Sequence, residues 1–174
     1  MPTPSRASLA QIIDAGREIV EGSGASGLTM QAVAERVGVR APSLYKKFAD
    51  RDELLRAVTG ATLEDLSVRL ESAGDDIAEL ARVYRSYAHE RPEAFRMMST
   101  VSMPVDALRQ PVEPLLRACA RVFGEEDALN AARFAVSWVT GFVQMEFAGA
   151  FRLGGDVDVA FEYGLRRLGS GLHP

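Results

Sequence analysis

Hydrogen-bond donors with no acid among them gather on one short stretch of the chain. The stretch contains Ser43, Tyr45, Lys46 and Lys47, and the next carboxylate along the chain is that of Asp50. Hydroxyl and ammonium groups donate to phosphate oxygens and to base edges, as a surface that binds nucleic acid requires. An isolated Lys-Lys pair is usually only a solvated surface, so the assignment depends on the helices that carry these donors.

Two short helices joined by a tight turn are predicted around the donors. The apolar stripe of the first helix consists of Met30, Val33, Ala34 and Val37. Thr29 stands where an N-cap residue is expected, and Gly38 follows the stripe with the freedom to adopt the positive φ that ends a helix. Pro42 suits the first position of the next helix, because its missing N–H would be unpaired there. This arrangement is typical of a helix-turn-helix.

The second helix is expected from Ala41 to Phe48, and its residues separate into two faces. Leu44 and Phe48 are one turn apart and predict the face that packs on the first helix. The donors are left on the outside, where the N-terminal residues of a recognition helix approach base edges. The sequence therefore predicts a surface that binds DNA.

Apolar stripes on either side of this segment predict two more helices. One covers residues 9–20 and ends at a glycine-rich break at 22–24. After the segment, Asp50 and Glu53 match a capping box, and a stripe over 54–70 predicts a helix of about five turns. We expect a three-helix head, from which this long helix leads into the rest of the chain.

Residues 28–56 resemble the DNA-binding segment of the TetR family of bacterial transcriptional regulators. In that family the recognition helix ends in a Leu-Tyr-x-x-Phe pattern, before a polar turn and an acidic, Leu-rich helix start. This chain has LYKKF at 44–48, ADR at 49–51 and DELL at 52–55. The resemblance implies that Thr29 lies near a phosphate and that Tyr45 and Arg51 bind phosphates. The residues that it places close to bases are Arg40, Ala41, Pro42, Ser43 and Lys46.

Not all of these residues can recognise a base by hydrogen bonding. Ala41 and Pro42 have no side-chain donor, so each can only contact a thymine methyl group or fix the shape of the surface. Direct recognition of bases is therefore expected to depend on Arg40, Ser43 and Lys46.

Net charge is distributed unevenly along the chain. The whole chain has a net charge of −4, but residues 1–56 carry eight Lys/Arg against seven Asp/Glu, while residues 57–174 carry net −5. Such a weakly basic head can bind DNA only if its cations lie on one face. We expect that face to consist of Arg40, Lys46, Lys47 and Arg51.

The remainder of the chain is predicted to be helical, because it contains no alternating run and no hairpin signal. Pro104, Pro111 and Pro114 are expected to confine the helices before residue 115 to short pieces. A helix near 125–151 is apolar on nearly all sides, which in a small domain predicts burial against a second subunit. We expect a homodimer through helices near 125–151 and 157–168, which would present two heads to a palindromic site on double-stranded DNA.

Parts of this region also resemble the C-terminal domain of one TetR subgroup, named for a Trp-His-Gly motif. Trp138 and Gly141 match the motif, but Thr140 stands in place of the histidine, so no role of an imidazole carries over. The family resemblance implies a small-molecule effector, and soft apolar side chains favour an apolar one. A plain hydrophobic core would use the same side chains. The candidate pocket residues are Phe95, Met98, Met103, Phe134, Trp138, Phe142 and Met145.

Other functions fit the sequence less well. His89 and His173 are far apart, and no HExxH, GxSxG, P-loop or GxGxxG motif occurs, so we expect no enzyme, no metal site and no cofactor. The single cysteine, Cys119, excludes an internal disulfide framework and is expected to be a buried apolar side chain. The polar N-terminus has no signal-peptide core and no membrane span is expected, so a cytoplasmic protein is predicted.

Together these features predict an all-α protein of about nine helices, a helix-turn-helix head with a helical-bundle body. Residues 1–52 are expected to form the DNA-binding domain, and residues 53–174 the effector-binding and dimerisation domain. The predicted function is sequence-specific regulation of transcription, by a repressor that the effector releases from its operator. The alternative is a dimeric helical module for protein–protein contact whose head does not bind DNA.

Overall fold

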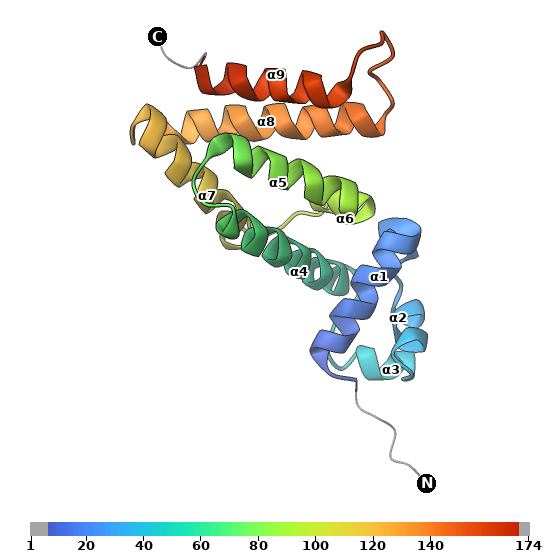
Figure 1. Cartoon of the computed structure of the whole chain (residues 1–174). Helices are drawn as coiled ribbons and strands as arrows, with labels where there is room; N and C mark the ends of the chain where they lie inside the picture. Colours follow the sequence, from blue (N-terminus) through green and yellow to red (C-terminus); the bar gives the residue numbers. More distant parts are fainter. Residues whose placement is uncertain (1–6, 171–174) are drawn as a thin grey trace. The chain divides into compact units, whose positions relative to one another are not determined.

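Helices account for the regular secondary structure of residues 7–170, the part of the chain that the computed structural model describes (Figure 1). This confirms the predicted all-α fold with about nine helices. None of the described helices is long and apolar enough to cross a membrane. In chain order the described helices are α1 (Leu9–Gly27), α2 (Met30–Arg36), α3 (Ala41–Leu44), α4 (Arg51–Ser72), α5 (Ile77–Glu90), α6 (Pro92–Thr100), α7 (Val105–Phe123), α8 (Ala128–Phe147) and α9 (Val157–Ser170).

The chain divides into two compact units that alternate along the sequence. Unit 1 consists of Met1–Asp65 and Glu90–Leu108, and unit 2 of Leu66–His89 and Arg109–Pro174. The helices α4 and α7 contribute residues to both units. This is a division by packing, so the functional boundary expected after residue 52 stays a prediction.

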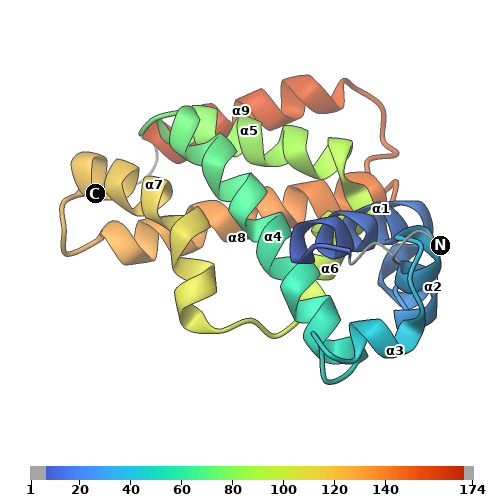
Figure 2. The same cartoon turned by 90° about the horizontal axis from the view of Figure 1, so that it is seen from below.

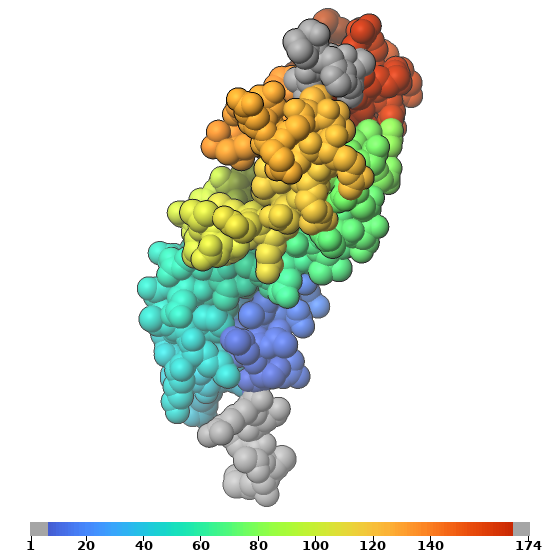
Figure 3. All heavy atoms as spheres, turned by 90° about the vertical axis from the view of Figure 1, so that its left-hand side faces the viewer, coloured from blue at the N-terminus to red at the C-terminus, as the bar shows by residue number. Residues whose placement is uncertain are grey.

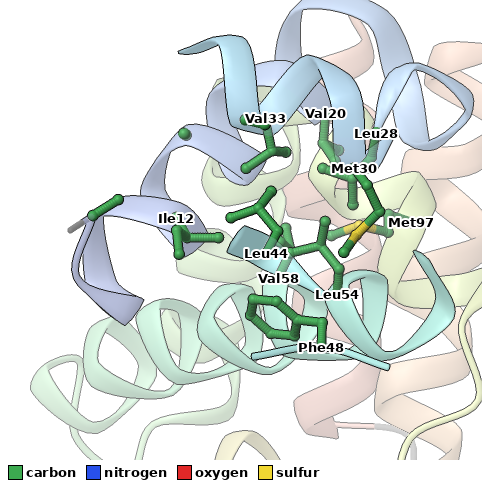
Figure 4. Close-up of a cluster of buried hydrophobic side chains, with 13 residues drawn as sticks. Ile12, Val20, Leu28, Met30, Val33, Leu44, Phe48, Leu54, Val58 and Met97 are labelled. Carbon is green, nitrogen blue, oxygen red and sulfur yellow. The ribbon is translucent and has the colours of Figure 1, made fainter. Parts of the chain in front are cut away.

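Unit 1 is organised around one apolar cluster to which α1, α2, α3, α4 and α6 contribute (Figure 4). Burial of an aliphatic or aromatic side chain contributes about 1.5–3 kcal/mol to folding, so this cluster is the main force that holds the helix-turn-helix together. The labelled side chains of the cluster are Ile12, Val20, Leu28, Met30, Val33, Leu44, Phe48, Leu54, Val58 and Met97.

Met97 brings α6 into this core, which the sequence does not predict. Its side chain is 1% exposed and belongs to the same cluster as Leu54 and Val58 of α4. Pro92 begins α6, with its missing N–H in the first turn. Unit 1 thus contains a helix from the middle of the chain in addition to the three helices of the predicted head.

The prolines before residue 115 do not divide the chain into short helices. The helix α7 runs from Val105 to Phe123 and contains both Pro111 and Pro114, so that prediction was wrong. A proline inside a helix removes one hydrogen bond and crowds the preceding turn, at a cost of about 3 kcal/mol in an isolated helix. Pro114 is buried, and tertiary packing of this kind can outweigh the intrinsic cost.

In unit 2, α8 and α9 pack side by side in opposite directions (Figures 1 and 2). Ala135 and Val139 of α8 share a buried cluster with Phe161 and Leu165 of α9. Trp138 stacks on Phe161, with the ring centroids 5.3 Å apart. These two helices are the pair that the sequence predicts near 125–151 and 157–168, although α8 is shorter than expected at both ends.

Trp138 lies where a side chain at Gly164 would be. A Cβ atom at Gly164 would lie 2.8 Å from the indole Cη2, which is closer than carbon atoms pack, so α9 approaches α8 only because residue 164 has no side chain. Two residues along α8, the hydroxyl of Thr140 is hydrogen-bonded to that of Tyr84 (3.1 Å). Burial raises the pKa of the Tyr84 phenol, although the hydrogen bond with Thr140 opposes the shift.

An ionic network joins α5, α8 and α9 within unit 2. Arg85 Nη2 donates to Glu146 Oε1 (2.5 Å) and to Asp158 Oδ1 (2.6 Å), and the guanidinium lies over the ring of Phe161 at 4.6 Å. His89 Nε2 is 3.2 Å from Glu146 Oε2. Burial opposes ionisation of Glu146, but the hydrogen bonds with Arg85 and His89 outweigh burial and hold the pKa of Glu146 below its ordinary value.

Candidate DNA-binding surface

Hydrogen bonds at the start and end of α2 fix the first half of the helix-turn-helix. Thr29 is the N-cap, and its Oγ1 accepts a hydrogen bond from the Ala32 N–H (3.0 Å). Gly38 has a φ of 70°, and the next N–H, that of Val39, donates to the Ala34 carbonyl (2.9 Å). The predicted N-cap at Thr29 and the predicted positive φ at Gly38 are both confirmed.

The second helix, α3, is shorter than predicted. Its α-helical part covers only Ala41–Leu44, and residues 45–47 continue as a turn. The Lys47 N–H donates to the Leu44 carbonyl (2.8 Å), three residues back, and the Phe48 N–H donates to the same oxygen (2.9 Å). The backbone therefore tightens after Leu44, as helix ends commonly do, while Phe48 keeps its position one turn beyond Leu44.

Apolar and polar side chains of this segment separate as predicted. Leu44 is fully buried and Phe48 is 4% exposed, whereas Tyr45 is 55% exposed although it is aromatic. Figure 3 shows the segment, in cyan, at the surface of unit 1. The other exposed donors of the segment are Ser43, Lys46 and Lys47.

Seven of the nine residues predicted to bind DNA are exposed, and only Ala41 and Arg51 are half-buried. Within residues 7–170, no acid forms an ion pair with Lys46 or Lys47, so their charges are available to a ligand. Arg36 of α2, by contrast, is paired with Glu18 of α1 (2.5 Å). The exposed seven are Thr29, Arg40, Pro42, Ser43, Tyr45, Lys46 and Lys47.

Arg40 begins the second helix without capping it. Its backbone is extended (φ −87°, ψ 141°), and its side chain makes no capping hydrogen bond at the start of α3. Arg40 is exposed and has no acidic partner in the described part of the chain. A guanidinium in this position has donors free for the acceptors of a guanine edge or a phosphate.

Arg51 differs from the other predicted contacts, because its guanidinium already has partners. Arg51 Nε donates to the Leu28 carbonyl (2.7 Å) and Nη2 donates to the Ala25 carbonyl (2.5 Å). The remaining nitrogen, Nη1, lies 3.9 Å from Asp52 Oδ1. No spacing pattern in the sequence points to these carbonyl oxygens as partners.

The residues proposed for an effector pocket divide between the two units. Phe95, Met98 and Met103 belong to unit 1, and the other four lie on α8 in unit 2. Phe95 is buried, whereas Phe134 is 51% exposed and Met145 is 47% exposed. Trp138 and Phe142 are in direct ring contact, with centroids 5.6 Å apart. The role of the seven residues in an effector pocket stays a prediction.

Titratable groups are not arranged for metal binding in the described chain. No group of three or more His, Cys, Asp or Glu residues between 7 and 170 could hold a metal ion. Cys119 is fully buried as predicted, and its burial raises the pKa of the thiol.

Comparison with known proteins assigns each of two parts of the chain to a protein family. Residues 12–58 match the family described as bacterial regulatory proteins of the tetR family, and residues 77–168 match the tetracyclin repressor-like C-terminal domain. The chain belongs to the TetR family. It is therefore a DNA-binding transcriptional regulator, and the expectation that it is no enzyme follows from the family as well.

Relatives support the family over nearly the whole chain. The HTH-type transcriptional regulator Rv0681 of Mycobacterium tuberculosis is 27% identical over 182 aligned residues, covering 97% of this chain and 83% of the relative. The tetracycline repressor protein class A from transposon 1721 of Escherichia coli is 29% identical, covering 86% and 73%. The crystal structure of a TetR variant from Acinetobacter baumannii AYE in complex with minocycline is 26% identical, with a TM-score of 0.71 over 95% of this chain and 96% of that chain.

Proposed function

We propose that this TetR-family protein is a repressor that binds a palindromic operator as a homodimer and is released by a small apolar effector. The observation that carries the proposal is a set of unpaired, exposed donors on α3 and the turn that follows it, above the buried pair Leu44 and Phe48. The donors are Ser43, Tyr45, Lys46 and Lys47. A surface of this kind offers hydroxyl and ammonium groups to DNA while the core keeps the helix in place.

Roles within the surface follow from the chemistry of each side chain. Thr29, Tyr45 and Lys47 contact phosphates, which fixes the head on the duplex without sequence preference. Arg40, Ser43 and Lys46 contact base edges, because each has a donor that can reach the acceptors of the major groove. Ala41 and Pro42 contribute shape or contact with a thymine methyl group.

The dimer uses the outer faces of α8 and α9. Phe134, Gly141 and Met145 follow one another at 7 and 4 residues along α8, which places them on one stripe. Both Phe134 and Met145 are about half exposed, and a Cβ at Gly141 would meet nothing within 4 Å. On α9, Val159 and Tyr163 are 62% and 55% exposed at a spacing of one turn. Two such apolar faces from each subunit pack into a four-helix interface, as the helices near 125–151 and 157–168 predict.

The effector acts by population shift. A ligand that prefers one arrangement of the two heads lowers DNA affinity by the ratio of its affinities for the two arrangements. The minocycline complex of the Acinetobacter relative supports a small-molecule effector here, and Trp138 and Phe142 supply apolar walls in unit 2. We also assign the C-terminal domain to the Trp-His-Gly subgroup, supported by Trp138 and Gly141, with the hydroxyl of Thr140 in place of the imidazole.

Transcription in vitro from a promoter that contains the selected operator tests this proposal. The protein should reduce transcript, and a template with one half-site scrambled should restore it. Minocycline is the first effector to add, followed by apolar compounds of similar size, and a true effector restores transcript without altering a control promoter. Increased transcript on addition of the protein would contradict the repressor assignment.

A further inference from the structure

The end of α1 has one backbone donor of its own, because the Leu28 N–H donates to the Ala25 carbonyl (3.3 Å). The helix is interrupted at Gly24, whose backbone is non-helical (φ 69°, ψ 175°), and its last piece ends at Gly27. Leu28 follows as the C-cap with an extended backbone (φ −73°, ψ 99°). The last carbonyl groups of a helix have no partners within the helix, and they form the negative end of its dipole. The last turn of α1 contains no basic residue. Further donors, and preferably a cation, must come from elsewhere in unit 1.

Arg51 supplies both the hydrogen-bond donors and the positive charge. Its Nε donates to the Leu28 carbonyl (2.7 Å) and its Nη2 to the Ala25 carbonyl (2.5 Å), so two N–H groups on one side of the guanidinium bind two neighbouring oxygens. The planar fork of arginine suits this geometry, and a lysine ammonium cannot reproduce it. The side chain is half-buried, which makes an unmatched carbonyl at this place more costly than at the surface.

The two partners lie at opposite ends of the helix-turn-helix. Leu28 directly precedes Thr29, the N-cap of α2, and Arg51 is the first residue of α4, 23 residues further along the chain. The contact therefore closes a loop that contains α2, the turn at Gly38 and α3. Closing a loop reduces the conformations open to it, so Arg51 limits how α3 can tilt on the core.

We propose that Arg51 is a positioning residue for DNA binding, which orients the helix-turn-helix through the Leu28 and Ala25 carbonyls instead of contacting a phosphate. Its one remaining nitrogen faces the carboxylate of Asp52 at 3.9 Å. This inference rests on the proposed role of the helix-turn-helix surface, and it replaces the phosphate contact expected for Arg51 from the sequence.

Arg51→Lys separates the two roles, because lysine keeps the charge that a phosphate contact needs and loses the fork that binds two carbonyls. We expect the Kd for the selected palindrome to rise about tenfold or more, with the slope of log Kd against log salt unchanged. Lys47→Ala is the matched comparison, since losing a phosphate contact lowers that slope by about 0.9 for each contact. The inference is overturned if Arg51→Lys binds like the wild type, or if Arg51→Gln lowers the slope by about 0.9 for each head.

Amide hydrogen exchange of the free protein gives a second readout that needs no DNA. Arg51→Lys should speed exchange at residues 29–38 about tenfold relative to α8. If the lysine variant does not fold, Arg51→Gln, which retains one amide donor, is measured instead. Unchanged exchange in a folded variant overturns the inference even if the wild type binds the palindrome. Failure of the wild type to bind any duplex would count against the proposed function, while faster exchange would still support the ordering role of Arg51.

Discussion

The carboxylate of Glu21 accepts a hydrogen bond from the backbone N–H of Ala94, 3.4 Å away, and a second one from that of Glu93 at 3.3 Å. Glu21 lies in α1, and the two N–H groups lie in the first turn of α6, where a helix has unpaired donors and the positive end of its dipole. A side chain of the predicted head thus caps a helix that the sequence assigns to the body.

Removing this cap should loosen α6 in unit 1. Glu21→Ala is expected to cost about 0.5–2 kcal/mol of unfolding free energy, the usual range for a lost N-terminal cap. Amide exchange at residues 93–95 should become faster than at α2. Asp14→Ala removes an exposed acid from the same helix and is the control. Equal effects of the two substitutions would show that charge, and not the cap, is responsible.

The turn of the helix-turn-helix depends on glycine at position 38. Gly38→Ala is expected to destabilise the protein by about 1–2 kcal/mol, because alanine is strained at a φ of 70° even though no atom lies within 4 Å of the added Cβ. Gly22→Ala also enters open space but lies within α1, so it should be neutral or stabilising. Urea unfolding measures both, and a similar loss in each would count against the role assigned to φ.

Tyr45 and Lys46 should have separable effects on DNA binding. Tyr45→Phe removes a hydroxyl proposed to donate to phosphate, so it should weaken binding to all duplexes by a similar factor. Lys46→Ala should relax the preference at one base pair of each half-site, by about 1–3 kcal/mol. Competition binding with single-base variants of the operator measures both. A uniform loss for Lys46→Ala would reassign that lysine to phosphate.

Glu146 should make the stability of unit 2 sensitive to acid. Its folded pKa is lowered, so its contribution is complete above the unfolded pKa of about 4.3 and is lost as the pH falls through the folded value. Glu146→Gln should therefore lower the unfolding free energy at pH 7, by about 1–3 kcal/mol, and the difference from the wild type should shrink below pH 4 or so. Thermal unfolding across pH 3–8 or thereabouts provides the measurement.

The control for Glu146 is an ion pair at the surface. Glu162 binds Arg82 through both carboxylate oxygens, but both side chains are exposed, so Glu162→Gln should change stability less at pH 7. If the two glutamine variants respond alike to pH, partial burial does not strengthen the Arg85–Glu146 pair.

The proposed dimer can be disrupted without altering the core. Phe134→Glu places a charge on the exposed stripe of α8 and should shift the protein to monomers by several kcal/mol of association free energy, roughly the cost of a buried unpaired charge. Leu129 is similarly exposed (49%) but lies on another side of α8, so Leu129→Glu should leave the dimer intact. Sedimentation velocity distinguishes the two. A wild type that is itself monomeric at micromolar concentration would refute the interface.

Features determined by neighbouring residues could be predicted from the sequence. The N-cap at Thr29, the positive φ at Gly38 and the burial of Leu44 and Phe48 each depend on a few consecutive residues and on helical periodicity. Periodicity predicts a recognition helix up to Phe48 because it reports which side chains share a face. It does not report where α-helical hydrogen bonding gives way to a tighter turn.

Contacts between distant parts of the chain could not be predicted in this way. Arg51 and Leu28 are 23 residues apart, and Arg85 and Glu146 are 61 residues apart. Glu21 and Glu93, which lies in the first turn of α6, are separated by 72 residues. Nothing in the periodicity of one helix specifies which polar group of another it meets. The continuity of α7 through two prolines depends likewise on packing that the local sequence does not contain.

Selection of bound duplexes from a random library, with wild type and the Tyr45→Ala, Lys46→Ala double variant in parallel, tests the central claim most directly. The wild type should enrich a palindrome whose half-site centres are about one helical turn, some 34 Å, apart, and the double variant should enrich none. Enrichment of the same palindrome by both proteins would show that these side chains do not recognise DNA. No enrichment by the wild type at low salt would contradict operator binding by the protein alone.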